Sequence, residues 1–433
     1  MKILVTTIPN IPAYFNAAYN MSVFQVGSYI RKNHPDAEVT CKDMSVLNFT
    51  WKDLANLLRR EEFDLISILC DYDSIDNLDR LIFYCRELSE YSKLLFFGRL
   101  VMQIPAFFKQ YNPDFISYSG DFESCISNAI HYISNNQQPS GNCYLCNGEY
   151  RDGGPVAPLS ADKFEFPDTS EVPYEAYYQL YKDDDSRYCG IPNRKELVVH
   201  VSRGCPIGCE FCDVQILQGL QDRRVSVERV VDYIEENQTK FDYVSFFSAI
   251  FTLKKKWLEQ FCHLMISRNI KVPWKCVTTV QSLERSDIEL MSRAGCFRIG
   301  LGIETLEVES KHILPREKLL KTQQLQKLFE KCNSLNIEVN AFLMVGLEGE
   351  TAEGIENTIN FIESSNNRAR LSLYTPYQNL HDKMTKWEVS KFNRQTFTDT
   401  TAFSREAKQI AYDVLYSRKY RKSEVQEKID KRL

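Results

Sequence analysis

Short apolar stretches alternate with helix-like stretches along the first 135 residues. Strand-like patterns cover residues 2–7, 37–42, 63–70, 93–98 and 115–119, and helical periodicity covers residues 23–32, 51–60, 75–91 and 123–133. Residues 63–70 and 93–98 are almost continuously apolar, which is typical of strands that are covered on both faces. The alternation predicts a doubly wound parallel sheet in residues 1–135, with ligands at the carboxyl ends of its strands.

Residues 136–195 differ in composition from the preceding segment and are predicted to form an irregular linker. Turn-forming polar residues dominate Asn135–Gly141 and Asp152–Pro155, and an acidic run follows at Asp183–Asp185. Aromatic residues are interspersed with these turns, whereas a freely mobile tether would be less aromatic. We therefore expect this linker to wrap over a neighbouring surface.

The strand–helix alternation returns after the linker. Strand-like segments are residues 197–201, 243–247, 275–280, 297–302, 339–345 and 371–375, and helical segments are 227–237, 256–268, 285–294, 319–335 and 352–364. Consecutive units of this kind predict a curved parallel sheet, a partial (β/α)6 barrel, over residues 196–385. The charged segment 386–433 is predicted to be a helical C-terminal extension.

Composition and charge narrow the class of protein. The chain has 433 residues, 53 Lys and Arg against 58 Asp and Glu, and a formal net charge of −5, which argues against general affinity for nucleic acid or anionic membranes. No secretory signal is recognisable, and no stretch reaches the roughly 18 apolar residues of a membrane span. These features predict a cytoplasmic protein, where thiols stay reduced.

Fourteen cysteines are present in the chain. In a reducing compartment, isolated cysteines act as small buried hydrophobes, whereas closely spaced cysteines bind metals or carry redox chemistry. The isolated cysteines, which we predict to lie in the core, are Cys41, Cys70, Cys85, Cys125, Cys262, Cys276, Cys296 and Cys332.

Three cysteines are grouped on the loop that follows the strand at residues 197–201. Cys205, Cys209 and Cys212 have C-x3-C-x2-C spacing, and short spacings of this kind hold iron–sulfur clusters. Three thiolates would leave one iron of a [4Fe–4S] cluster open to a substrate, whereas a closed zinc site needs four ligands. A zinc site completed by His200 or Cys189, and a chance grouping, stay open as alternatives.

The strand, the three-cysteine loop and the repeated βα units resemble the radical S-adenosylmethionine (SAM) superfamily. The cysteine motif includes the aromatic Phe211 before the last cysteine. Gly300–Thr305, Gly346–Thr351 and Tyr374–Leu380 are similar to motifs at later strands of that family. The resemblance covers about residues 195–385.

This resemblance implies a mechanism and a set of site residues. In the family, the open iron chelates the amino and carboxylate groups of SAM, and one electron cleaves the sulfonium to give a 5′-deoxyadenosyl radical. Cys205, Cys209 and Cys212 would be the cluster ligands. The residues that would contact SAM are Phe211 beside the adenine, Ser248, Glu304 and Arg316 as polar contacts, and Val345, Gly346 and Leu347 through the backbone.

The chain departs from the family pattern at two places. Where relatives carry Gly-Gly-Glu or paired aspartates, this chain has Phe246–Phe251, and Thr278–Gln281 replaces a segment that often holds Arg and Asp. The hydroxyl of Ser248 can accept a hydrogen bond from an ammonium group but supplies no charge. We expect a less polar site than in typical relatives.

The N-terminal domain resembles the cobalamin-binding class of this superfamily. Gly98 and Arg99 occupy one turn after a strand, and Ser119 and Gly120 another, where a corrin would rest. No Asp-x-His-x-x-Gly motif is present to ligate cobalt, and His34 and His131 are interpreted as structural. Two interpretations remain: cobalamin bound without a histidine, or a degenerate domain that acts as a scaffold.

The function predicted from this resemblance is cobalamin-dependent C-methylation of a small molecule or short peptide, with flavodoxin or ferredoxin as electron donor. A cobalamin-independent cyclase, epimerase or rearrangement enzyme is the first alternative. A tRNA methylthiotransferase is disfavoured, because Cys41, Cys70 and Cys85 are not placed for a second cluster and few residues remain for an RNA-binding domain. Cys143 and Cys146 form a second C-x2-C pair, which we interpret as packing residues.

Overall fold

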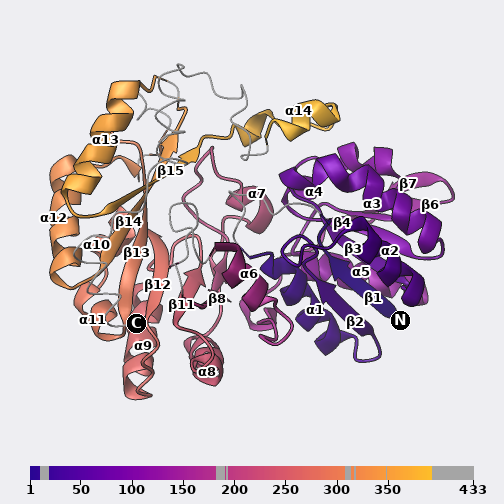
Figure 1. Cartoon of the computed structure of the whole chain (residues 1–433), viewed down its shortest axis with the longest axis horizontal. Helices are drawn as coiled ribbons and strands as arrows, with labels where there is room; N and C mark the ends of the chain where they lie inside the picture. Colours follow the sequence, from indigo (N-terminus) through magenta and orange to yellow (C-terminus); the bar gives the residue numbers. More distant parts are fainter. Residues whose placement is uncertain are drawn as a thin grey trace. The chain divides into compact units, whose positions relative to one another are not determined.

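The computed structural model describes residues 1–9, 19–181, 191, 194–307, 314–315, 318–347 and 349–392. The chain divides into two compact units (Figure 1). The first unit contains the described residues up to Leu180, together with Asp213–Gly219 and those from Pro376 onward. The second unit contains the other described residues up to Thr375. The predicted helix after residue 392 lies outside the described residues.

The first unit is built on a sheet whose parallel part has the strand order β2-β1-β3-β4-β5. Its parallel strands are β1 (Lys2–Thr6), β2 (Glu38–Lys42), β3 (Leu65–Leu69), β4 (Lys93–Phe97) and β5 (Phe115–Ser117). The intervening helices are α1 (Met21–Asn33), α2 (Trp51–Arg60), α3 (Ile75–Leu88), α4 (Arg99–Gln103) and α5 (Phe122–Asn135). This is the flavodoxin-like doubly wound order, in which the strand order reverses between β1 and β3.

An antiparallel hairpin extends this sheet at the β5 edge. β6 (Asn142–Cys146) pairs with β5 and with β7 (Glu149–Asp152). The prediction of irregular structure is therefore wrong for residues 142–152. The turn residues Asn147 and Gly148 both have positive φ, 51° and 82°, as the tight Asn-Gly hairpin turn requires. That dipeptide was the sequence signal for this hairpin.

The rest of the first unit consists of short elements. They are the helix α6 (Tyr174–Tyr181), the short helices α7 (Val214–Gln218) and α14 (Lys386–Ser390), and the 3-10 turns η1 (Tyr72–Ser74), η2 (Pro105–Tyr111), η3 (Ala161–Lys163) and η6 (Tyr377–Asn379). The phenol of Tyr177 on α6 bonds the buried carboxylate of Asp43, and the Tyr177 ring lies 4.3 Å from that of Tyr19. The linker thus packs on the first sheet through aromatic side chains, as predicted.

The second unit is a six-stranded parallel sheet in the order β15-β14-β13-β12-β11-β8. Its strands are β8 (Glu196–His200), β11 (Tyr243–Phe247), β12 (Trp274–Thr279), β13 (Cys296–Glu304), β14 (Glu338–Val345) and β15 (Arg368–Leu373). Among the described residues β8 and β15 do not pair with each other, so the sheet stays open. The predicted fold class, a doubly wound domain followed by a partial barrel, is confirmed.

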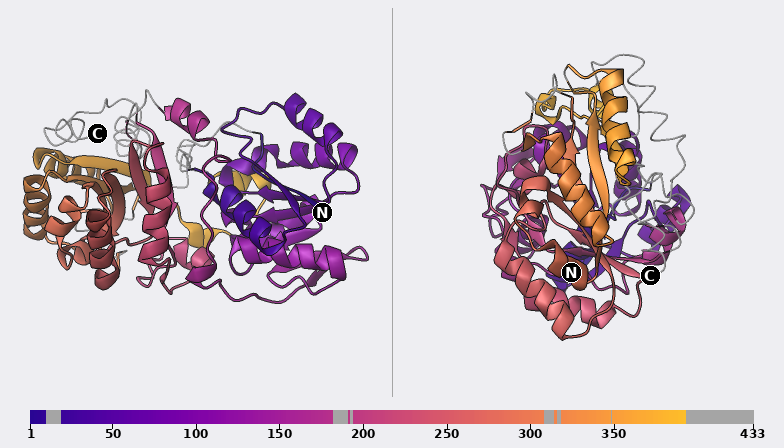
Figure 2. Two further views of the ribbon diagram at one scale, coloured as in Figure 1. Left: turned by 90° about the horizontal axis from the view of Figure 1, so that it is seen from below. Right: turned by 90° about the vertical axis from the view of Figure 1, so that its left-hand side faces the viewer.

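Helices follow the strands of the second unit and line the outside of its sheet (Figure 2). They are α8 (Val227–Asn237), α9 (Lys255–Ser267), α10 (Val280–Glu284), α11 (Ile288–Arg293), α12 (Thr322–Ser334) and α13 (Ala352–Ser364). The single helix predicted for residues 285–294 is wrong at its start, because Arg285 ends α10 and Asp287 caps α11 by accepting the amide N–H of Leu290. A two-stranded ribbon, β9 (Ser202–Arg203) with β10 (Arg223–Arg224), completes the unit.

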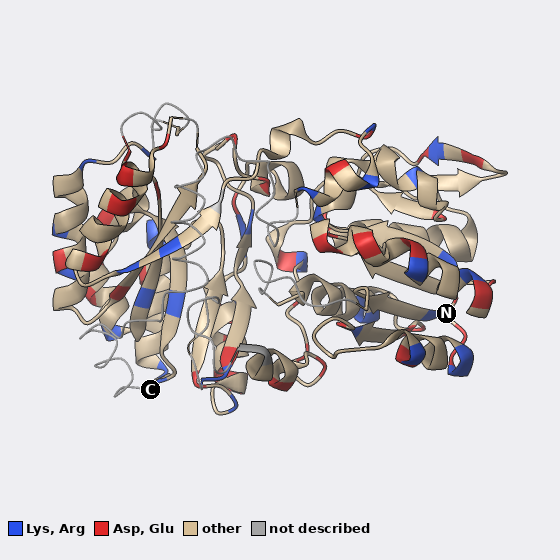
Figure 3. Cartoon of the chain, turned by 45° about the horizontal axis from the view of Figure 1, so that its top comes forward, with Lys and Arg blue, Asp and Glu red and all other residues tan. Residues whose placement is uncertain are grey.

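The two faces of this sheet carry different side chains. Successive strand residues point to opposite faces, so Trp274 packs with Phe246 and Phe261 on the helix side while Lys275 points to the inner side. Basic and acidic positions are drawn on these strands in Figure 3. Lys275 Nζ lies 2.8 Å from Glu196 Oε1, and both side chains are almost fully buried. The half barrel is therefore apolar outside and partly charged inside.

The isolated cysteines are packing residues, as predicted. Seven of the eight are buried and Cys41 is partly buried, and each is a free thiol. Cys262, Cys276, Cys296 and Cys332 lie close to one another in the second unit, where burial raises the pKa of the Cys262 and Cys296 thiols above the usual range. Inert, protonated thiols of this kind are expected in a core.

Candidate functional site

The three-cysteine loop lies at the carboxyl end of the half-barrel sheet. It begins directly after β8 and β9, where the ribbon with β10 fixes its start. The amide N–H of Cys212 donates to the carbonyl of Cys209 at 3.1 Å, which closes a turn between these two cysteines. Cys209 is buried, and Cys205 and Cys212 are half-buried. Burial raises the pKa of the Cys209 thiol to about 12, and the nearby Lys318 ammonium opposes this shift.

The three thiols of this loop lie near one another, since Cys205 and Cys212 both act on the Cys209 thiol. Among the described residues, no three His, Cys, Asp or Glu side chains come close enough to share one metal ion. His200 does not complete a zinc site either, because its ring stacks on Phe247 with centroids 5.2 Å apart. Burial lowers the pKa of His200 to about 3. Cys189 lies outside the described residues.

A buried ion pair adjoins the cysteine loop. Glu304, at the end of β13, bonds the ammonium of Lys318, and both side chains are about nine-tenths buried. Lys318 Nζ also lies 5.7 Å from the centroid of the Phe211 ring. Burial would lower the pKa of Lys318, but the Glu304 carboxylate raises it above its usual value. Glu304 and Phe211 are thus brought together by a residue that the sequence reasoning missed.

Glu304 has an uncommon backbone conformation. Its φ is +65°, and the pairing of β13 with β14 shifts register between Gly302 and Glu304. A residue with a side chain in the left-handed region is strained, and such residues gather at functional sites. The shift turns the Glu304 carboxylate back over Gly302, where a Cβ would lie 2.6 Å from Oε1. Arg316, the other predicted polar contact, lies outside the described residues.

Ser248 follows β11 and faces the start of the cysteine loop. Its hydroxyl lies 2.8 Å from the hydroxyl of Ser202, which precedes Cys205 by three residues. The turn after Ser248 is held by Arg224, whose guanidinium donates to the carbonyls of Ile250 (2.8 Å) and Phe251 (2.6 Å). The sequence reasoning missed Arg224, since its role depends on contacts between β10 and the turn after β11, which are 26 and 27 residues apart in the chain.

The turn after β14 is held by its own chain. The amide N–H groups of Gly346 (2.7 Å) and Leu347 (3.4 Å) donate to Glu350 Oε2, and the carbonyl of Val345 accepts from the Tyr374 amide at 2.9 Å. Burial raises the pKa of Glu350 to about 7. The Gly346 and Leu347 amides and the Val345 carbonyl are therefore already bonded within the chain.

In the first unit, Gly98 and Arg99 lie where β4 ends. Gly98 has φ +130°, and a Cβ at this position would lie 2.3 Å from the carbonyl oxygen of Cys70, which follows β3. The Arg99 guanidinium bonds Asp71 (2.7 Å) and Asp213 (3.5 Å) and lies 5.7 Å from the centroid of the Tyr72 ring. A partly buried cluster of charged side chains therefore lies beside the point where the two strand ends approach each other.

The second predicted corrin turn, Ser119–Gly120, is covered by the chain itself. A Cβ at Gly120 would lie 2.3 Å from a methyl group of Val156, and the Leu159 amide donates to Asp121 Oδ2 at 2.7 Å. The segment around Val156 belongs to the same unit and packs directly on this turn. A ligand could reach Gly120 only if that segment moved.

A third polar group on this edge was missed by the sequence reasoning. Asp43, which follows β2, is fully buried and accepts from Thr7 Oγ1 (2.9 Å), Ser45 Oγ (2.8 Å) and Asn20 Nδ2 (2.9 Å). The Tyr177 hydroxyl is a further partner. A buried carboxylate with this many donors is satisfied, and it anchors α6 to the sheet beside the point where the strand order reverses.

Other cysteines and histidines in the described part of the chain pack within the fold. Cys143 and Cys146, three apart on β6, point to opposite faces, so the two thiols do not face each other. Cys85 lies in the core on α3, apart from Cys41 on β2. The rings of His34 and His131 are 4.7 Å apart, and His34 Nε2 is 2.7 Å from Ser127 Oγ. These contacts agree with packing roles.

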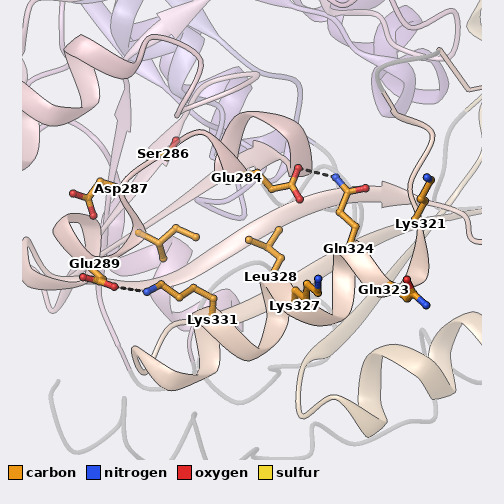
Figure 4. Close-up of a pocket in the computed structure, with 11 residues that line it drawn as sticks. Glu284, Ser286, Asp287, Glu289, Lys321, Gln323, Gln324, Lys327, Leu328 and Lys331 are labelled. Atoms are coloured by element: carbon orange, nitrogen blue, oxygen red, sulfur yellow. Dashed lines mark hydrogen bonds and ion pairs between the residues drawn. The ribbon is translucent and has the colours of Figure 1, made fainter.

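A surface groove of about 630 Å3 lies between α10–α11 and α12 (Figure 4). Gln324 Nε2 donates to Glu284 Oε2 at 2.7 Å across it, and Lys331 pairs with Glu289. None of the residues predicted for the site lines this groove.

Comparison with known proteins gives the class of the second unit. Residues 199–362 match the family described as the Radical SAM superfamily, so this part of the chain is a radical SAM domain. The superfamily predicted from the cysteine motif is confirmed.

Individual relatives extend the similarity. The chain is 29% identical over 220 residues to the anaerobic magnesium-protoporphyrin IX monomethyl ester cyclase of Rubrivivax gelatinosus, a match that covers 48% of this chain and 39% of the cyclase. It is 23% identical over 366 residues to an uncharacterized methyltransferase of Pyrococcus horikoshii, which covers 81% of this chain and 75% of that protein.

Among solved structures, the fold matches the radical SAM methyltransferase TsrM from Kitasatospora setae, which was solved with cobalamin and a [4Fe–4S] cluster bound. The TM-score is 0.69 at 14% identity, and the match covers 87% of this chain and 76% of TsrM. It includes both units, so the predicted architecture of the cobalamin-binding class is confirmed at the level of fold.

No helix among the described residues combines the length and the apolar composition that crossing a membrane requires.

Proposed function

We propose that this protein is a radical SAM enzyme that transfers a methyl group to an unactivated carbon of a small molecule or short peptide. The observation that carries the proposal is the loop with Cys205, Cys209 and Cys212 at the carboxyl edge of a radical SAM domain. The methyltransferase relatives and the fold shared with TsrM support the outcome of the reaction. Flavodoxin or ferredoxin is the proposed electron donor.

The three thiols fit a [4Fe–4S] cluster. They come from one loop and lie near one another, and closely spaced thiolates are the ligands of such clusters. When bound, such a cluster supplies the electron that cleaves SAM. The protein's part is to present three deprotonated sulfurs, which the Lys318 ammonium assists by lowering the pKa of Cys209 against the effect of burial.

The residues around the cysteine loop are proposed to bind SAM. Ser248 would accept a hydrogen bond from the amino group, and Phe211 and the Val345–Leu347 turn would face the adenine. Glu304 and Lys318, already paired, would offer a carboxylate and an ammonium to the polar parts of SAM. Arg316 stays a prediction from the family pattern.

Cobalamin is proposed to bind the first unit and to carry the methyl group. At the Gly98–Arg99 edge the buried Gln103 Nε2 has no hydrogen-bond partner, although its Oε1 accepts from Tyr72. An orphaned donor is costly, and the amide oxygens of a corrin would satisfy it. Gly98 and Arg99 would hold the corrin. Ser119 and Gly120 would contribute only if the segment at Val156 were displaced.

Iron loading tests the cluster. After anaerobic reconstitution with iron and sulfide, the full chain should hold about four irons and cleave SAM to 5′-deoxyadenosine under reductant. Cys209→Ala should lose the cluster, while Cys85→Ala, a core cysteine of the other unit, should retain it. Wild-type production of 5′-deoxyadenosine by Cys209→Ala would refute the assignment.

Corrin retention separates methyl transfer from the second candidate function. After anaerobic incubation with hydroxocobalamin and desalting, the visible spectrum should show about one corrin per chain. If no corrin is retained, a cobalamin-independent cyclase, epimerase or rearrangement enzyme is favoured. The packing of Val156 on Gly120 is the observation that favours this alternative.

A further inference from the structure

We propose that the Glu304–Lys318 pair sets the reduction potential of the cluster, with Lys318 raising it and Glu304 lowering it. The inference rests on the proposed function, because it requires a cluster at Cys205, Cys209 and Cys212.

Lys318 is held beside the cysteines from several sides. Its side chain is 12% exposed, its ammonium bonds Glu304, and the Phe211 ring of the cysteine loop lies 5.7 Å away. Its charge acts on two thiols, Cys209 and Cys212. A lysine with this little exposure stays at one distance from its surroundings, because it lacks the freedom of a surface side chain.

The charges predict opposite effects for the two partners. Reduction adds one negative charge to the cluster, so a fixed cation nearby stabilises the reduced form more than the oxidised form. A carboxylate at the same place does the reverse. Charge and burial are established determinants of the potentials of iron–sulfur clusters. Lys318 and Glu304 therefore act as positioning and tuning groups without a bond to iron.

The conformation of Glu304 supports a dedicated role for the pair. An ordinary salt bridge does not need a non-glycine residue at φ +65° or a register shift in the central strand β13. Here both are present, and they place the carboxylate at Lys318. Strain of this kind persists only where the surrounding structure enforces it.

A matched ion pair on the same unit serves as control. Lys331 and Glu289 join α12 to α11, and their side chains are 45% and 63% exposed. Solvent screens such a pair, and neither residue contacts the cysteine loop.

The experiment is a redox titration of the reconstituted full chain, followed by electron paramagnetic resonance in the absence of SAM. Lys318→Met should lower the midpoint potential by about 59 mV, a tenfold change in a one-electron equilibrium, and Glu304→Gln should raise it. Lys318→Arg should keep the wild-type potential, and Lys331→Met and Glu289→Gln should leave it unchanged.

Shifts of the same sign, or no shift, in Lys318→Met and Glu304→Gln would overturn the inference. Because SAM is omitted, a shift cannot arise through a contact with that ligand. If Lys318→Met fails to load iron, the midpoint potentials of Glu304→Gln and Glu289→Gln are compared instead. A raised potential in Glu304→Gln alone supports the inference, and equal potentials in the two variants overturn it. A wild-type protein that forms no cluster would instead refute the proposed function.

Discussion

Replacement of Gly98 by alanine should destabilise the first unit selectively. Gly98 follows β4 and packs against the backbone of Cys70, which follows β3. Its φ and ψ are +130° and 176°, a region that only glycine occupies without strain. An added Cβ would lie 2.3 Å from the carbonyl oxygen of Cys70 and 3.0 Å from its carbonyl carbon and amide nitrogen. These are backbone atoms, so no side chain can rotate away, and β3 and β4 must separate at their ends.

The cost can be worked from these contacts. The strained backbone contributes about 1–3 kcal/mol. Separation of the strands also weakens the hydrogen bond from the Cys70 amide to the Phe97 carbonyl, now 2.7 Å, which is worth about 1 kcal/mol. Moving the Cys70 backbone away from the added Cβ costs further free energy, in addition to these two contributions. We expect Gly98→Ala to lower the free energy of unfolding of this unit by about 3 kcal/mol or more.

Gly148→Ala is the matched control, because it has positive φ (82°) but nothing within 4 Å of the added Cβ. Only backbone strain is expected there, about 1–2 kcal/mol. Urea unfolding of the full chain gives the energies, and hydrogen exchange of peptides from β3 and β4 assigns the loss to the first unit. Equal losses in the two variants would show that the contact with Cys70 does not matter, and the reasoning would fail.

Two further predictions concern the second unit. Arg298 and Glu338 form an ion pair whose side chains are 3% and 2% exposed. Arg298→Met alone should lower the free energy of unfolding, measured in urea, by about 3–5 kcal/mol, and adding Glu338→Leu should restore most of this loss. Additive losses in the double variant would contradict the pairing. The pKa of Glu350 is raised from 4.5 to about 7. The stability that its protonated carboxyl group contributes to the fold is therefore fully present below pH 4.5 and is lost as pH rises through 7. Relative to Glu350→Gln, the wild type should therefore lose up to about 3 kcal/mol of stability between pH 4.5 and 8, and a pH-independent difference would rule this out.

Most of the fold could be predicted because strands and helices carry local periodicity. The continuous apolar runs at residues 63–70 and 93–98 correspond to β3 and β4. The hairpin β6–β7 was missed although Asn147–Gly148 announced it, because the polar residues around it suggested loop structure. The start of α11 was missed because two short helices, separated by a break at Arg285–Asp287, show the hydrophobic pattern of one longer helix.

The sequence by itself determined the elements and the cysteine loop, because periodicity and the spacing of Cys205, Cys209 and Cys212 are properties of neighbouring residues. Only the tertiary structure decided which side chains surround that loop. Lys318 reaches Glu304 across 14 residues, Tyr177 reaches Asp43 across 134, and Val156 lies on Gly120. Such contacts depend on strand register, on a bulge in β13 and on the path of the linker, and none of these leaves a periodic trace in the chain.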